Sequence, residues 1–175
     1  KDFNQDGKIN TEDKQVIKNV GVKWFGGWSN QVQYKNVGLD VLFQFVKQNS
    51  INYIAQSFIP GSLTNQPIEF LDAYSPNNPS AKYQRYSTGS QTLASQAYNN
   101  FKQSDQSVSD GSYIRLKNIS ISYQFKIANT SSLKLFLNGQ NLWTLTNYFG
   151  ADPEFVLSGY LPPLKEYTLG LQLNF

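Results

Sequence analysis

The last nine residues of the chain alternate between apolar and polar side chains without interruption. The apolar positions are Tyr167, Leu169, Leu171, Leu173 and Phe175. Because successive side chains of a β-strand point to opposite faces, this alternation predicts a strand with one apolar and one polar face. Two kinds of protein use such a strand. In a membrane barrel the apolar face meets lipid, and in a soluble sheet it is buried against a core.

Four earlier segments repeat this alternation. They span residues 24–34, 39–46, 113–125 and 133–143. The turn at 35–38 predicts a hairpin between the first two, and the turn at 126–132 predicts another between the last two. With the terminal segment, the sequence predicts an all-β fold of five antiparallel strands.

The connections between these strands differ sharply in length. Those at 35–38 and 126–132 are short, whereas those at 47–112 and 144–166 are long. Bacterial outer-membrane barrels sort their connections in this way, with short periplasmic turns and long extracellular loops, and a soluble sandwich has no reason to do so. Since such barrels need at least about eight strands, the five strands are expected to belong to a larger wall.

Two cations interrupt the apolar side of the third predicted strand. Arg115 and Lys117 share the side of Ile119 and Ile121 if the alternation is unbroken. Because charges are costly in mid-membrane and tolerated near its surface, this end of the strand is expected at the headgroups or beyond them. The alternative is a β-bulge that reverses the faces within the strand.

Composition excludes several functions. The chain carries 15 Lys and Arg against 12 Asp and Glu, and its net charge of +3 is too dispersed to indicate nucleic-acid binding. It contains no Cys and no His, so disulfides, His-ligated zinc and His-assisted nucleophiles are excluded. No apolar run approaches the ~20 residues of a membrane helix, so any membrane crossing would use strands. The absence of Met predicts a piece of a longer protein or a processed product.

The first residues predict a calcium-binding loop. Oxygen ligands recur at the spacing of an EF-hand or dockerin-like loop, which brings several oxygens to one hard cation. The expected ligands are Asp2, Asn4, Asp6, the backbone carbonyl of Lys8, and Asp13. A short exit helix is expected over 11–20. An Asx-rich turn that needs no ion is the alternative.

The long segment 48–111 loses the strand period and is rich in Ser, Asn, Gln, Pro, Gly and Tyr. A short helix is expected over 67–74, with a proline near its start. Tyr74, Tyr83 and Tyr86 are candidates for stacking against a ligand. In the alternative interpretation, these aromatic side chains pack the loop onto itself.

Several motifs resemble the C-terminal part of SusC/RagA-type TonB-dependent outer-membrane transporters. Residues 110–123, DGSYIRLKNISISY, are similar to the family stretch SYLRLKNITLSY. Residues 138–154, with NGQNLWT, Tyr148, Gly150 and DPE, are similar to GQNLxTxTxYxGxDPE. Residues 2–13 resemble DxNxDGxIxxxD, and residues 74–79 resemble WTPENP with Tyr74 in place of Trp. Further departures are Gln84, where a Pro is common, and Phe125-Lys126 in place of Leu-Pro.

The resemblance implies a 22-stranded barrel with an N-terminal plug, in the outer membrane of a Gram-negative bacterium. It implies a SusD-like surface lipoprotein as a lid, TonB as the source of energy, contact with outer-membrane lipid, and a glycan or peptide as the ligand. Residues 1–20 would form a calcium-type loop and short helix within an extracellular loop, and 21–175 the C-terminal barrel strands. Phe175 would match the C-terminal aromatic that serves as an assembly signal.

Two other classes of function stay open from the residues. A soluble, calcium-braced β-sandwich could bind carbohydrate at a cell surface through its tyrosines. An enzyme is the least favoured, since Asp152 and Glu154 would share a strand face like a glycosidase pair. The intervening Pro153 and the resemblance both favour a structural turn there and no catalysis.

Overall fold

The structure is a computed structural model, which describes residues 1–16, 18–89, 91–127, 131–156 and 161–175. The chain divides into two compact units. One consists mainly of Lys1–Gly21 and Asn49–Ser109, and the other of Val22–Gln48, Asp110–Phe155 and Leu161–Phe175. No helix among the described residues is long and apolar enough to cross a membrane.

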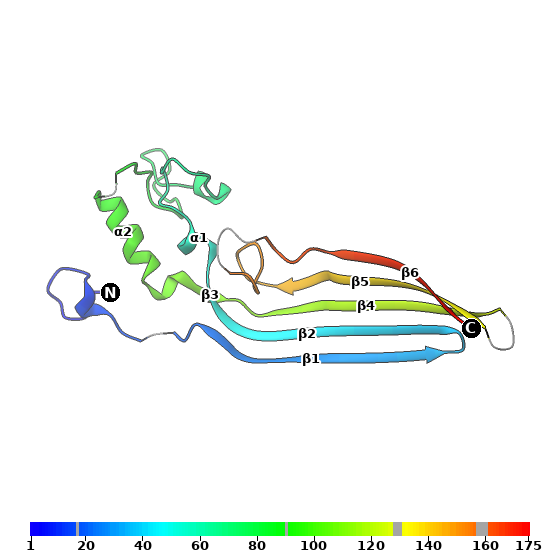
Figure 1. Cartoon of the computed structure of the whole chain (residues 1–175). Coiled ribbons are helices and arrows are strands. Elements are labelled where there is room, and N and C mark those ends of the chain that lie inside the picture. Colours follow the sequence, from blue (N-terminus) through cyan, green and yellow to red (C-terminus); the bar gives the residue numbers. More distant parts are fainter. Residues whose placement is uncertain (17, 90, 128–130, 157–160) are drawn as a thin grey trace. The chain divides into compact units, whose positions relative to one another are not determined.

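The second unit is built on five long strands (Figure 1). They are β1 (Gly21–Tyr34), β2 (Val37–Ile51), β4 (Tyr113–Lys126), β5 (Ser132–Thr146) and β6 (Glu166–Asn174). Their order in the sheet is β1-β2-β4-β5-β6, and the short β3 (Val108–Asp110) pairs with β2. The five predicted strands are therefore confirmed, and most extend a few residues beyond their predicted ends. Residues 128–130 of the second predicted turn lie outside the described residues.

One face of the sheet is apolar across neighbouring strands. The register aligns Leu39 with Ile121, Ile121 with Leu137, and Leu137 with Leu169. These side chains form a row that runs across β2, β4, β5 and β6, and Leu169 is 71% exposed. A row of exposed apolar side chains requires an apolar environment outside this chain.

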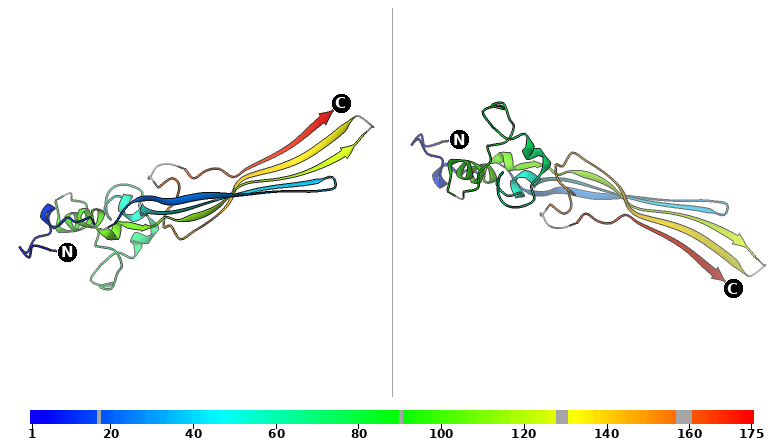
Figure 2. Two further views of the ribbon diagram at one scale, coloured as in Figure 1. Left: turned by 90° about the horizontal axis from the view of Figure 1, so that it is seen from below. Right: turned by 90° about the horizontal axis from the view of Figure 1, so that it is seen from above.

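The opposite face carries polar side chains at the next register position. Asp40 aligns with Ser120, Ser120 with Asn138, and Asn138 with Thr168. The sheet twists along its length (Figure 2), as extended strands of L-residues do. Adjacent rows of opposite polarity confirm that the period-2 pattern reports two chemically different faces.

A β-bulge lies at Lys117. Leu42 pairs with Asn118 and Phe43 with Leu116, so the ladder between β2 and β4 skips Lys117. The ladder to β5 skips it as well. Since one extra residue reverses the faces of the strand, Arg115 lies on the polar side. The expectation that Arg115 shares the apolar side is therefore wrong, and the bulge alternative is confirmed.

The first unit contains the two α-helices, α1 (Tyr53–Gln56) and α2 (Leu93–Lys102). Neither is predicted from the sequence pattern. The buried Tyr98 of α2 donates its hydroxyl to the carbonyls of Ile54, at 2.6 Å, and Ser57, at 3.0 Å. Burial raises the pKa of the Tyr98 phenol to about 12. This tyrosine thus ties the two helices together.

The exit helix expected over 11–20 is wrong for the described residues. Only η1 (Thr11–Asp13), a single 3-10 turn, forms there, and Lys14 is already extended. Val16 is fully exposed, so the segment has no apolar face to pack, and short helices depend on such packing. The helix expected over 67–74 is reduced to η2 (Ile68–Leu71), another 3-10 turn.

Candidate functional site

The most buried charged group of the described residues is Arg115, whose side chain is 1% exposed. The bulge at Lys117 turns Arg115 onto the polar face, where it aligns with Gln44 of β2 and Thr144 of β5. Its Nε donates to the Thr144 hydroxyl at 3.0 Å. The Tyr113 ring centroid lies 5.2 Å from the guanidinium carbon, which adds a cation–π contact. Side chains of β4 and β5 thus contact this cation directly, through one hydrogen bond and one cation–π contact.

The connection after β5 supplies the balancing anions. Arg115 Nη2 lies 2.5 Å from Asp152 Oδ2, and Nη1 lies 2.5 Å from Glu154 Oε2. Lys117 Nζ lies 3.3 Å from the same Glu154 oxygen. Two cations therefore face two anions, and we call Arg115, Lys117, Asp152 and Glu154 the arginine cluster. An ion pair this buried needs such complete pairing, because each unpaired charge would be strongly destabilising.

Backbone contacts fix the same connection. Gln48 Nε2 donates to the carbonyl of Pro153 at 2.6 Å, and Asp152 Oδ1 accepts the backbone N–H of Glu154 at 2.8 Å. The Asp-Pro-Glu motif is therefore a turn held against the polar face of the sheet. Since the 1%-exposed guanidinium engages both carboxylates, the geometry favours the structural interpretation of the motif over a catalytic pair. Sequence reasoning noted Arg115 and the motif separately and missed their pairing.

The predicted calcium ligands form a hydrogen-bonded loop. Asp2 accepts the N–H groups of Gln5 and Gly7, and Asp6 accepts that of Lys8. Asn4 Oδ1 accepts the N–H of Asp6 at 3.2 Å. Among the described residues, no group of three or more Asp or Glu side chains stands close enough to hold a metal ion. Calcium binding stays a prediction.

Asp13 closes this loop. Its carboxylate accepts the N–H groups of Phe3, at 2.7 Å, and Asn10, at 2.9 Å. The N–H groups of Asn10 and Phe3 hold the pKa of the Asp13 carboxyl below its ordinary value. The ionised form of Asp13 therefore stabilises the loop, whether or not a cation is bound.

Two of the three candidate tyrosines, Tyr83 and Tyr86, contact the buried Phe70. The Tyr83 ring lies edge-on to Phe70, with centroids 5.3 Å apart, and the Tyr86 hydroxyl donates to the Phe70 carbonyl at 2.6 Å. Tyr74 pairs its backbone N–H with the Tyr83 carbonyl at 2.9 Å. The structure therefore brings these residues together. Tyr83 and Tyr86 pack the loop, and ligand contact by any of the three is still a prediction.

Phe175 follows the end of β6 and is 92% exposed. It lies on the side of Leu171 and Leu173 by strand parity. A role in assembly also stays a prediction.

Comparison with known proteins finds relatives over almost the whole length of the chain. No family model matches the chain. The chain is 28% identical over 195 residues to TonB-dependent receptor P3 of Formosa agariphila. This alignment covers 99% of the chain and 18% of the relative. It is 28% identical over 185 residues to TonB-dependent receptor SusC of Bacteroides thetaiotaomicron. Here the alignment covers 99% of the chain and 17% of the relative. Over almost its whole length the chain is similar to a segment of SusC/RagA-type TonB-dependent receptors.

Solved structures show the same fold. The RagAB peptide importer in its open-open state matches with a TM-score of 0.70 at 23% identity, covering 98% of this chain and 20% of the other. The closed-closed state of the same importer also matches with a TM-score of 0.70, at 24% identity, and the match covers 92% of this chain and 18% of the other. The segment spans 17–19% of the length of the curated relatives it matches. Its sheet is therefore part of an outer-membrane β-barrel.

The arginine cluster generates a prediction. Arg115→Met in the full-length receptor should lower the stability of the folded state by ~3–5 kcal/mol, because two carboxylates lose a buried partner. The measurement is urea unfolding in lipid vesicles, with protease cleavage near residue 152 on intact cells as a second readout.

Two controls separate lost pairing from general damage. Lys117→Met should cost less than ~1 kcal/mol, because both Lys117 and Glu154 are 30% exposed in their side chains. The triple variant Arg115→Met, Asp152→Asn, Glu154→Gln should recover part of the loss, because no unpaired charge is left. If Arg115→Met and Lys117→Met cost the same, the cluster does not hold the connection.

Proposed function

We propose that this segment forms the C-terminal wall of an active, TonB-dependent importer of glycans or peptides. The observation that carries the proposal is the pair of adjacent rows, Leu39 to Leu169 and Asp40 to Thr168, which have opposite polarity. In a barrel the first row meets lipid and the second lines the lumen. The segment therefore gives an imported solute a polar wall to pass and takes no part in changing it chemically.

The connection 147–156 would have a defined role in this importer. The arginine cluster holds its Asp-Pro-Glu turn against the polar face, on the side of Ser120 and Asn138. On that face the turn occupies part of the lumen mouth. It would therefore limit the size of the solute that passes, and it would do so as a fixed element.

The partners follow from the relatives. Receptors of the SusC type and the RagAB importer support a two-protein system, so a SusD-like lipoprotein is the expected lid and TonB the energy source. The solved neighbour is named a peptide importer, whereas resemblance to the family at large favours glycans. Both ligand classes are therefore candidates for this receptor.

Growth of a deletion strain tests the importer. Loss of the receptor gene should abolish growth on one class, oligosaccharides or peptides, as sole carbon source, and the intact gene should restore it. Growth on the corresponding monosaccharide or amino acids is the control, and a strain without TonB should show the same defect. Unchanged growth on every oligomer tested, in both strains, would contradict the proposal.

We also propose that residues 2–13 bind calcium and brace an extracellular excursion. The oxygen donors of Asp2, Asn4, Asp6 and Asp13, with the Lys8 carbonyl, are of the type that calcium prefers. Their turns are already formed by side chain to backbone hydrogen bonds. An ion here would stabilise only the folded loop.

Titration calorimetry tests the calcium proposal. The full-length receptor should release or absorb heat with calcium, and Asp6→Ala should remove the part of that heat due to this loop. Asp105→Asn, which alters an exposed carboxylate elsewhere in the same unit, is the matched control. Identical titrations of the natural receptor and Asp6→Ala would contradict the proposal that this loop binds calcium.

We further propose that Phe175 serves as an assembly signal. Its 92% exposed ring is free of packing within this chain's described residues, so its removal should not weaken the sheet itself. Phe175→Ser should lower the amount of heat-modifiable, folded barrel in the outer membrane. Leu171→Ser, a change within β6 itself, is the control that shows the effect of weakening the strand. An unchanged amount of Phe175→Ser barrel would refute the signal.

A further inference from the structure

The ladder between β5 and β6 stops at one irregular stretch of β5. Among the described residues its last pair is Gln140 with Glu166, although β5 continues beyond this pair. In the ladder to β4, the next two residues of β5, Asn141 and Leu142, lie opposite the single Lys117. Two residues opposite one form a β-bulge, which bends a strand and can terminate its pairing. The bulge of β5 therefore lies where the ladder to β6 ends.

The backbone of Asn141 takes a turned conformation in this bulge. Its φ is 52°, in the left-handed region that Asn occupies more readily than most residues with a side chain. The following side chain, Leu142, folds back over Gly139, where an added Cβ would lie 2.6 Å from Leu142 Cδ1. A left-handed residue and an open position at Gly139 thus provide the turned backbone and the space that the bulge requires.

The side chain of Asn141 reaches the residues that precede β6. Its Nδ2 donates to the carbonyl of Leu164 at 3.3 Å. Leu164 follows Pro162 and Pro163, which have no N–H group and so cannot donate to a continued ladder. One side-chain hydrogen bond therefore holds this end of the connection after β5 at the point where the ladder stops.

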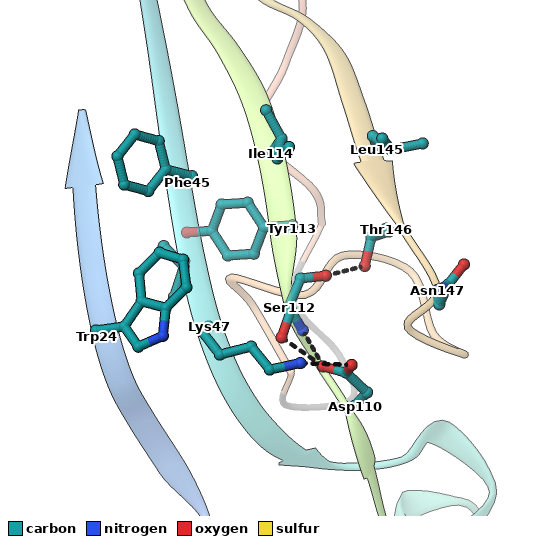
Figure 3. Close-up of a pocket in the computed structure, with 11 residues that line it drawn as sticks. Trp24, Phe45, Lys47, Asp110, Ser112, Tyr113, Ile114, Leu145, Thr146 and Asn147 are labelled. Carbon is teal, nitrogen blue, oxygen red and sulfur yellow. Dashed lines mark hydrogen bonds and ion pairs between the residues drawn. The ribbon is translucent and has the colours of Figure 1, made fainter. Parts of the chain in front are cut away.

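The start of the same connection is bound to the same part of β5. The Thr146 hydroxyl, at the end of β5, donates to the carbonyl of Ser112 at 2.7 Å (Figure 3). Further along, the arginine cluster holds the Asp-Pro-Glu turn, and Arg115 itself donates to the Thr144 hydroxyl at 3.0 Å. Both ends of the connection are therefore attached close to the bulge.

We infer that Asn141 is a positioning residue, and that it and the arginine cluster act as one clamp on the two ends of this connection. Their two points of attachment on β5, Asn141 and Thr144, are three positions apart, which is roughly 10 Å in a strand. Because attachments this close restrain the connection at its neck, loosening one of them should release both ends. Only the place of the clamp at the lumen mouth rests on the proposed importer.

Asn141 meets two requirements of the clamp at once. Glycine would accept a φ of 52° but has no side-chain donor for the Leu164 carbonyl. Aspartate tolerates the left-handed region, but its carboxylate accepts hydrogen bonds and donates none. These two residue types therefore remove the hydrogen bond and keep the backbone of the bulge.

Limited proteolysis of the full-length receptor, purified in detergent, tests the clamp. Trypsin reports the end of the connection by cleavage after the exposed Lys165, and a glutamate-specific protease reports its start by cleavage after Glu154. Asn141→Gly and Asn141→Asp should each raise both cleavage rates roughly five-fold, the factor expected when one ordinary hydrogen bond is lost. Peptide masses identify the two cuts.

Two further variants complete the test. Asn138→Gly, the same substitution in the same strand but outside the bulge, should leave both rates unchanged. Arg115→Met should raise cleavage after Lys165 as well, and the Asn141 variants decide the question if heat-modifiability on a gel shows that Arg115→Met does not fold. A rise after Lys165 alone in Asn141→Gly, or no rise at either site, would overturn the clamp. Because the receptor is purified, neither result bears on import.

Discussion

The architecture of the sheet depends on one extra residue, Lys117, which both ladders of β4 skip. Without this bulge, Arg115 would lie on the apolar face, where a cation in a barrel wall costs about 2–4 kcal/mol at mid-membrane. With it, Ile114 and Leu116 join the apolar side, and Arg115 joins the polar side. In β5 the same ladder skips two residues, Asn141 and Leu142, so the faces of β5 do not reverse, and Asn141 has a φ of 52°. One local irregularity thus keeps two chemically opposite faces continuous.

The arginine cluster is a consequence of that reversal. A guanidinium that is 1% exposed on the polar face has lost its water, and the two carboxylates of the Asp-Pro-Glu turn replace it. Because Arg115 presents five donors in a planar fork, it engages Asp152, Glu154 and the Thr144 hydroxyl at once, which a lysine could not. The connection after β5 is therefore fixed by charge pairing and needs no hydrophobic core of its own.

The sequence predicted the features that depend on neighbouring residues and missed those that depend on distant ones. The five strands follow from a period of two that each segment carries in itself, and Tyr167 to Phe175 displays it without a flaw. The pairing of Arg115 with Asp152 joins residues 37 positions apart, so no local pattern reports it. The helix expected over 11–20 was wrong because cap residues alone do not form a helix whose Val16 has nothing to pack against. The α2 helix was missed because its polar sequence, LASQAYNNFK, shows its one buried tyrosine only once packed on α1.

In the proposed importer, the position of the cluster along the strands limits where the Asp-Pro-Glu turn can lie. Arg115 aligns with Gln44, seven positions after the start of β2, so it stands roughly 16 Å above that end at ~3.3 Å per residue and a ~45° tilt. In the proposed barrel, with the apolar band beginning at the start of β2, this height lies within the band, and the guanidinium is tolerated there because it faces away from lipid. The Asp-Pro-Glu turn would therefore reach down the inside of the wall from the lumen mouth. In the proposed importer, that turn would reduce the space for a solute beside these strands, and the arginine cluster would resist its displacement.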